Sequence, residues 1–202
     1  MGDILTTANI TNAFVNTLIV IMIIPVFGTI FNLIKQGALK ILSSVTSAKT
    51  ANIIVNRLTF IGVVHHELSH ALLAFLTGAK IESINLFKPD KNTGTLGNVR
   101  YIPRGNKILQ SVQLTFSSVA PTPCGVLSSI LIVYLVIPKC VAVWQFIIVY
   151  YTLVSIILHM DLSKQDIKVA LKGAPILMLL TYIILLITRA NLIELLKGII
   201  KS

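Results

Sequence analysis

The feature that most restricts the fold of this chain is a series of long apolar runs separated by short polar stretches. Hydrophobic residues make up 55% of the 202 residues, charged residues only 12%, and the mean hydropathy is +0.88. Soluble domains carry about twice that charged fraction, and a fold of this size has too little interior to bury so many apolar side chains. The sequence therefore predicts a multi-pass membrane protein.

The predicted fold is an all-α polytopic membrane protein with one β-hairpin, forming a single domain over residues 1–202 with a core at about 58–171. Two segments rich in Ile, Val, Leu and Tyr, 79–87 and 95–102, flank a turn signal and predict the hairpin. About five transmembrane helices are expected, at residues 13–33, 58–76, 125–137, 141–158 and 174–187. Three further helices are expected: interfacial ones at 36–56 and 190–202, and one at 108–120 that is too short to span alone.

The net charge of +10 is compatible with two kinds of partner, because basic proteins bind nucleic acids or anionic membrane surfaces. Here single Lys and Arg residues lie between apolar runs, which favours membrane flanks over nucleic acid. They divide almost evenly between the two sides, so the positive-inside rule leaves the orientation open.

Cys124 and Cys140 form no metal or disulfide pattern and are interpreted as small buried hydrophobes. The N-terminus lacks a cleavage signal, so a retained first span is expected.

One predicted transmembrane helix carries the sequence His66-Glu67-Leu68-Ser69-His70, which matches the HExxH motif of zinc metalloproteases. Residues four apart lie on one face of an α-helix, so the imidazoles of His66 and His70 can bind a single Zn²⁺. Glu67 lies close to that metal without ligating it. Its carboxylate can accept a proton from the attacking water and transfer it to the leaving amine. The motif therefore predicts a hydrolytic metal centre.

The depth of the motif supports a functional interpretation, because ionisable side chains are costly inside a bilayer and usually mark function. At 1.5 Å per residue, His66 lies about 12 Å along the helix axis from residue 58, inside the bilayer but off its centre. The alternative is a polar cluster that satisfies its own hydrogen bonds between helices. His65 points about 100° away from the His66 and His70 face, and we interpret it as an interfacial or supporting histidine.

Two histidines are too few ligands for a catalytic zinc, which usually has three protein ligands and one water. The other acids at a suitable depth are Asp161 and Asp166, with His159 close by. Glu82 and Asp90 belong to the predicted hairpin and are expected to be solvated. The residues alone leave the choice between Asp161 and Asp166 open.

Over residues 58–171 the order of features resembles the site-2 protease family of intramembrane zinc metalloproteases. The motif helix is followed by a hairpin, by a helix that opens on small residues and prolines, and by an apolar helix that runs into a polar turn with an aspartate. The segments that carry the resemblance are His66-Glu67-Leu68-Ser69-His70-Ala71 and Ala120-Pro121-Thr122-Pro123-Cys124-Gly125.

The resemblance implies that Zn²⁺ is the cofactor and that Asp166, by its position, is the third ligand. The family's Leu-Asp-Gly motif is absent, since Gln165 precedes Asp166 and Ile167 follows it. The Asn and Pro that precede the family's aspartate are also missing, and Ser69 stands where the family commonly has glycine. The chain therefore resembles a divergent, compact branch of the family.

Asp166 also has a purely structural interpretation. It occupies the third helical position behind Ser163, which fits an N-capping pattern, and an acid there favours the helix dipole. A cap and a ligand are thus the two alternatives for Asp166, and Asp161 is the reserve ligand.

Two questions of arrangement follow from the predicted elements. Simple alternation of spans puts the start of the motif helix and the turn at 161–166 on opposite sides of the membrane, although one metal needs them together. Either residues 108–120 form a re-entrant half-helix, or the polar turn dips into the membrane beside a water-filled cavity. The hairpin either receives an extended substrate by strand addition, with Asn98 and Arg100 facing it, or only covers the site.

Together these observations predict an intramembrane zinc endopeptidase that hydrolyses membrane-embedded or membrane-adjacent proteins in the plasma membrane of a prokaryote. Zn²⁺ would polarise the scissile carbonyl and acidify a water, with Glu67 as general base and then general acid. The expected partners are the lipid bilayer and a membrane-protein substrate, without nucleic acid. The alternative function is that of a non-catalytic membrane transporter or metal-binding scaffold, in which Glu67 would have no functional role.

Overall fold

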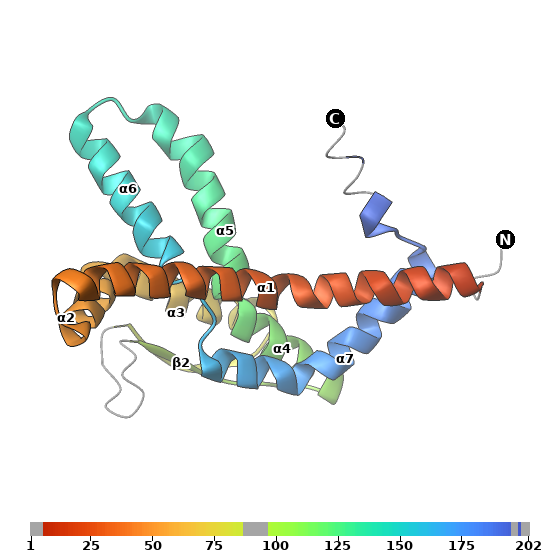
Figure 1. Cartoon of the computed structure of the whole chain (residues 1–202). Coiled ribbons are helices and arrows are strands. Elements are labelled where there is room, and N and C mark those ends of the chain that lie inside the picture. The colour runs from red at the N-terminus through yellow and green to blue at the C-terminus, as the bar shows by residue number, and fades with distance from the viewer. Residues whose placement is uncertain (1–5, 87–96, 195–197, 199–202) are drawn as a thin grey trace.

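The computed structural model describes residues 6–86, 97–194 and 198 of the chain. These residues form helices and one two-stranded antiparallel sheet (Figure 1). The helices are α1 Thr7–Val45, α2 Ala48–Ile53, α3 Phe60–Leu76, α4 Lys107–Val119, α5 Pro121–Leu131, α6 Val143–Ile157 and α7 Lys164–Thr188, and the strands are β1 Lys80–Asn85 and β2 Asn98–Ile102. A π-helical turn, Ile54–Leu58, joins α2 to α3, and α5 continues through Ile132–Val136 and Ile137–Lys139.

The first helix, α1, runs without a break for 39 residues and is longer than the predicted span at 13–33. The prediction of a separate interfacial helix at 36–56 is wrong in its first part, which continues α1. Residues with good helix propensity such as Lys35, Gln36 and Lys40 follow the apolar run, so nothing stops the helix there. The helix ends at Thr46, and the side chain of Ser47 then caps α2 by accepting the Thr50 N–H.

The motif helix and the hairpin agree with the sequence-based expectations. α3 ends at Leu76, and Gly78 stops it in the left-handed region with a φ of 87°. The hairpin that follows is antiparallel, with a bulge between Ile81 and Ser83. Its predicted turn, including Asp90, lies outside the described residues.

Three of the helices after the hairpin, α4, α5 and α7, begin earlier than predicted, whereas α6 begins two residues later, at Val143. The predicted short helix at 108–120 is α4, and the predicted third span at 125–137 begins four residues earlier, at Pro121. A proline is well suited to the first position of a helix, because no intrahelical bond to its nitrogen is needed there. α7 likewise begins at Lys164 rather than at 174, because Ser163 caps it.

Three described helical segments are long and apolar enough to cross a membrane: Thr7–Val45, Pro121–Lys139 and Lys164–Thr188. The pair Ala48–Leu58 and Phe60–Leu76 would make a fourth span, but it is bent by 63°. α6 has 15 residues and is shorter than a typical span. The count of five spans therefore stays a prediction. Of the predicted C-terminal helix, 192–194 and 198 are helical, and most of the rest lies outside the described residues.

Unlike a soluble protein, the described chain exposes many large apolar side chains and buries many polar ones. On α4 the buried side chains are polar, while Ile108, Leu109 and Phe116 are exposed. On α6 the apolar Val143 and Trp144 have 76% and 61% of their surface exposed. Such broad apolar exposure is unfavourable in water and favourable in lipid. These helices indicate a membrane protein.

The helices meet in a junction around α3, which contacts α4, α5, α6 and both strands. Figure 1 shows α5 and α6 side by side as a helical hairpin that projects from the rest of the described chain. α7 packs along α4 and α1. The N-terminal end of α7 and the end of α6 thereby reach the middle of α3, where the motif lies.

The approach of α6 to α3 is close at Gly62. A Cβ at this position would lie 1.9 Å from the carbonyl oxygen of Ser155 and 2.6 Å from His159 Nδ1. The Gly62 N–H donates to Ser155 Oγ at 2.7 Å, and that hydroxyl in turn donates to the Thr59 carbonyl at 2.8 Å. Glycine at this position therefore allows the residues before α7 to reach the motif.

We expect Gly62→Ala to destabilise the protein by about 1–3 kcal/mol, the usual range for overpacking a tight contact. The clash involves backbone, which cannot move aside as a flexible side chain does. Gly37→Ala in α1 is the matched control, because nothing lies within 4 Å of the added methyl group. Thermal unfolding in detergent should show a lower midpoint for Gly62→Ala and an equal or higher one for Gly37→Ala. Equal midpoints for both would contradict the close contact.

Candidate metal centre

The two motif histidines face each other on α3. Their Nε2 atoms are 3.1 Å apart, and their ring centroids are 4.7 Å apart with an interplanar angle of 78°. His70 is buried, and His66 is partly buried. The spacing of four residues thus brings both imidazoles to one point, as the helical period requires.

A backbone carbonyl fixes each ring from the opposite side. His66 Nδ1 lies 2.7 Å from the His159 carbonyl oxygen, and His70 Nδ1 lies 2.6 Å from the Ser117 carbonyl oxygen. A carbonyl oxygen only accepts, so each Nδ1 is the donor. In the neutral rings both Nε2 atoms then carry lone pairs and cannot hydrogen-bond to each other. Two lone pairs at this distance repel unless a cation lies between them.

Asp166 brings a carboxylate to the same point from the N-terminal turn of α7. Its Oδ1 lies 3.4 Å from His70 Nε2, and its Oδ2 lies 3.9 Å from His66 Nε2. The same carboxylate takes part in a capping box, because Oδ2 accepts the Ser163 N–H at 2.8 Å and Ser163 Oγ accepts the Asp166 N–H at 3.1 Å. The capping role and the position beside the histidines are therefore compatible.

The three groups form the candidate metal centre: His66, His70 and Asp166, with their ligand atoms within 4.8 Å of one another. In a tetrahedral zinc site, bonds of about 2.0–2.1 Å hold neighbouring ligand atoms about 3.3 Å apart. The 3.1 Å between the two Nε2 atoms and the 3.4 Å from His70 Nε2 to Asp166 Oδ1 are close to that value, and the second carboxylate oxygen, Oδ2, lies 3.9 Å from His66 Nε2. Two neutral imidazoles and one carboxylate are also a donor set that catalytic zinc accepts. The residues present therefore fit a zinc ion.

The reserve ligand, Asp161, is engaged elsewhere. Its carboxylate oxygens lie 3.1 and 3.2 Å from Lys35 Nζ on α1. His159 contributes its carbonyl oxygen to His66, while its own ring is held through Nδ1, which donates to the Ser155 carbonyl at 2.9 Å. The structure thus brings Asp166, and not Asp161 or the His159 ring, to the two histidines.

Glu67 is buried, with 8% of its surface exposed, and forms no hydrogen bond with the residues that the structure describes. It lies against the hairpin: a Cβ on Gly97 would be 2.6 Å from Glu67 Cγ and 3.1 Å from its Cδ. The absence of a side chain at Gly97 leaves room for the glutamate. A buried carboxylate without a hydrogen-bond donor is costly, so its presence on the motif helix requires an explanation.

Two further polar residues near the centre, His65 and Tyr101, have side-chain partners. His65 Nε2 lies 2.9 Å from Ser128 Oγ on α5, which agrees with a role away from the metal. Tyr101 of β2 places its hydroxyl 3.4 Å from Ser118 Oγ, and burial raises the pKa of the phenol, which stays protonated. Glu82 on β1 is exposed, as expected.

Some residues that hold the site carry no signal in the sequence. The carbonyl groups of Ser117 and His159 belong to the backbone, which every residue has, so no residue type marks them. Gly97 and Lys35 were not expected at the site either. Only the packing of the hairpin on α3 and of α1 along α7 brings them there.

Comparison with known proteins adds no relative to this description. No protein-family model matches the chain, and neither the curated proteins nor the solved structures include a match. The assignment of a function therefore depends on the geometry of the centre and on the motif itself.

Proposed function

We propose that the chain is a zinc-dependent endopeptidase that hydrolyses membrane-embedded or membrane-adjacent polypeptides, as a divergent member of the site-2 protease family. The observation that carries the proposal is the convergence of two imidazole Nε2 atoms and one carboxylate beside a buried glutamate. The histidines and Asp166 account for metal binding. Glu67 is not one of these ligands, so its carboxylate is available for proton transfer.

The chemistry divides between the ion and the chain. Bound zinc supplies a Lewis acid for the scissile carbonyl and lowers the pKa of a water. His66 and His70 would hold the ion through Nε2, and the Ser117 and His159 carbonyls keep both rings in the tautomer that this requires. The Glu67 carboxylate takes a proton from the attacking water as the C–O bond forms, and delivers it to the amine nitrogen as the C–N bond breaks.

The position of the hairpin supports a substrate in extended conformation. Gly97, next to the start of β2, touches Glu67, so a peptide paired with the sheet would pass close to the centre. Arg100 on β2 is exposed and free to face such a peptide. The side chain of Asn98, in contrast, is held by Asn85 Nδ2 at 3.1 Å. We therefore propose Arg100 rather than Asn98 as the strand residue that faces the substrate.

The membrane arrangement proposed here has five spans in the plasma membrane of a prokaryote, with α6 and the bent pair added to the three longer helices. α4 would be the re-entrant half-helix. It is 13 residues long, buries a polar face and is set off from α5 at Ala120. An element that enters and leaves on the same side leaves the parity of the spans unchanged. Asp166 and the histidines would then reach the same depth through a polar turn before α7 that dips into the membrane beside a water-filled cavity.

The rival function is a non-catalytic metal-binding membrane protein, such as a transporter or scaffold. It would use the same three ligands. Burial of Glu67 favours the endopeptidase, because a site that only binds metal gains nothing from an unpaired carboxylate that is not a ligand.

Removal of the metal should abolish cleavage reversibly. We expect the detergent-purified protein to cleave casein, or polypeptides of a solubilised membrane fraction, and to lose this activity with a zinc chelator. Added Zn²⁺ should restore it, and new N-termini identified by mass spectrometry would locate the cleaved bonds. Protein that binds zinc but generates no new N-termini from either substrate would support the rival function.

A further inference from the structure

The segment between α6 and α7, residues 158–163, carries much of the geometry of the metal centre. The carbonyl of His159 accepts from His66 Nδ1 at 2.7 Å, and the carbonyl of Met160 accepts from Thr122 Oγ1 at 2.8 Å. Ser163 ends the segment as the N-cap of α7, three residues before Asp166. A shift of this segment, which we call the ligand turn, would displace both the ring of His66 and the carboxylate of Asp166.

The first helix holds the ligand turn through a partly buried ion pair. Lys35 Nζ on α1 lies 3.1 and 3.2 Å from the two carboxylate oxygens of Asp161, and the two side chains are 20% and 16% exposed. Exposed ion pairs contribute little, but one held in a fixed geometry away from water is worth more. The pair joins an element at the N-terminus to the ligand turn.

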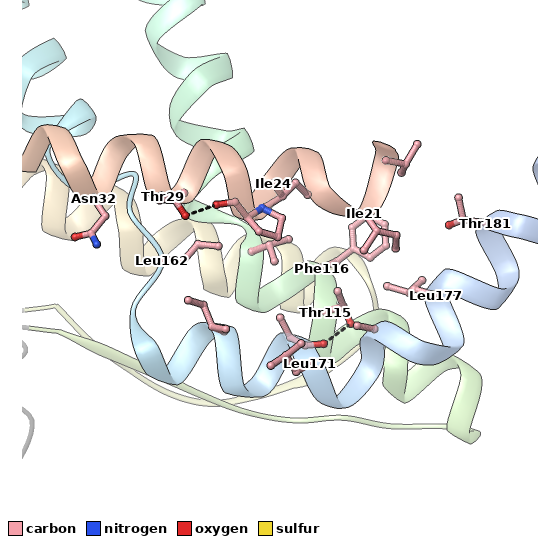
Figure 2. Close-up of a pocket in the computed structure, with 17 residues that line it drawn as sticks. Ile21, Ile24, Thr29, Asn32, Thr115, Phe116, Leu162, Leu171, Leu177 and Thr181 are labelled. Atoms are coloured by element: carbon pink, nitrogen blue, oxygen red, sulfur yellow. Dashed lines mark hydrogen bonds between the residues drawn. The ribbon is translucent and has the colours of Figure 1, made fainter. Parts of the chain in front are cut away.

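A second contact lies one residue further along the turn. Leu162 packs on Gly28 of α1, where an added Cβ would lie 3.1 Å from Leu162 Cγ. Figure 2 shows Asn32 and Leu162 at one end of an apolar cavity of about 310 Å³. This cavity lies between α1, α4 and α7, so α1 is not tightly packed on the neighbouring part of α7. The Lys35–Asp161 pair, beyond Asn32, is therefore a main link between α1 and the turn.

We propose that Lys35 is a positioning residue for the metal centre and acts through Asp161 on the ligand turn. The ion pair fixes the turn so that the His159 carbonyl meets His66 and Asp166 meets both histidines. Asp161 is thus a support of the site and not its ligand. The inference rests on the metal binding in the proposed function, but not on peptide hydrolysis.

The test is the zinc affinity of the detergent-purified full chain, measured by competition with a chromophoric chelator. Lys35→Met and Asp161→Asn should each weaken zinc binding by about 10–100-fold, as loss of outer partners of a metal site commonly does. The double variant should bind no more weakly than either single variant, because both remove the same interaction. Lys35→Arg should stay within a few-fold of wild type.

The matched control is Lys40→Met, which removes an exposed lysine from the same helix. It should leave zinc affinity unchanged. The visible spectrum of the Co²⁺-loaded protein gives a second readout, since a displaced Asp166 changes the ligand field while a lower folding stability does not. If Lys35→Met does not elute as a folded protein, Lys35→Gln, which retains an N–H donor, takes its place.

Unchanged zinc affinity and an unchanged Co²⁺ spectrum in Lys35→Met and Asp161→Asn would overturn the inference, and so would Lys35→Arg behaving like Lys35→Met. Either result leaves the endopeptidase proposal standing, because wild type still binds zinc. Weaker binding in the variants, together with a wild type that cleaves nothing, would support the positioning role and count against the endopeptidase. A wild type that binds neither ion would overturn both.

Discussion

Glu67→Gln is expected to leave zinc bound and to slow peptide hydrolysis by about 10²–10⁴-fold, the usual contribution of a general base. The amide has nearly the same shape as the carboxylate, so it fits beside Gly97, but it cannot accept the proton of the attacking water. Glu67 lies outside the set of three ligands, so the metal should remain. Zinc content and the rate of casein cleavage, measured on the same preparation, separate binding from catalysis.

The control for this substitution is Glu82→Gln, which makes the same chemical change at an exposed position on β1. It should preserve both zinc content and cleavage rate. If Glu67→Gln kept the full rate, the proton would travel by another group and the endopeptidase mechanism proposed here would be wrong. If Glu67→Gln lost the zinc instead, the glutamate would be a ligand.

Asp166→Asn is expected to weaken zinc binding by more than about 100-fold, because even the loss of an outer hydrogen bond at a metal site costs 10–100-fold. Asparagine keeps an oxygen that can accept the Ser163 N–H, so the cap of α7 survives while the negative charge is lost. The variant thereby separates the two roles of Asp166. Competition with a chelator measures the zinc affinity, and circular dichroism monitors the helix content.

Ser163→Ala provides the complementary control. It removes the side-chain cap of α7 and costs about 1 kcal/mol of stability, but it leaves all three ligands in place. We expect nearly normal zinc affinity. Zinc retained by Asp166→Asn but abolished by Asp161→Asn would make Asp161 the third ligand, and Asp166 would then serve α7 only.

The motif helix and the hairpin could be predicted because their signals are local. The spacing of His66 and His70 fixes their shared face in any α-helix, and Gly78 marks the end of that helix. The inward-facing polar side chains of α4 were not predicted. The helical period shows that a helix has a polar and an apolar face, but in a membrane protein it does not show which face is turned to the protein interior. The length of α1 was also missed, because Lys35 and Lys40 suggested an interface where helix propensity allowed the helix to continue.

The third member of the centre could be predicted only in part. The order of elements predicted Asp166 as the third ligand, but the residues alone left the choice between Asp161 and Asp166 open. For Asp166, an N-capping role was the alternative to a ligand role. The structure places Lys35 on Asp161 and lets one carboxylate, that of Asp166, serve the cap and the cluster together. Both facts depend on contacts between segments nearly 100 or more residues apart, such as the separation of 126 between Lys35 and Asp161. No local pattern encodes such contacts.

The two carbonyl groups that hold the histidine rings have a consequence for assembly. One comes from α4 and the other from the ligand turn, so the rings adopt their metal-binding tautomer only after three separate segments have docked. The motif helix alone would bind metal weakly, and tight binding would arise late, with the tertiary fold. Zinc would then stabilise the docked state by mass action, so that metal supply and correct insertion into the membrane become thermodynamically linked.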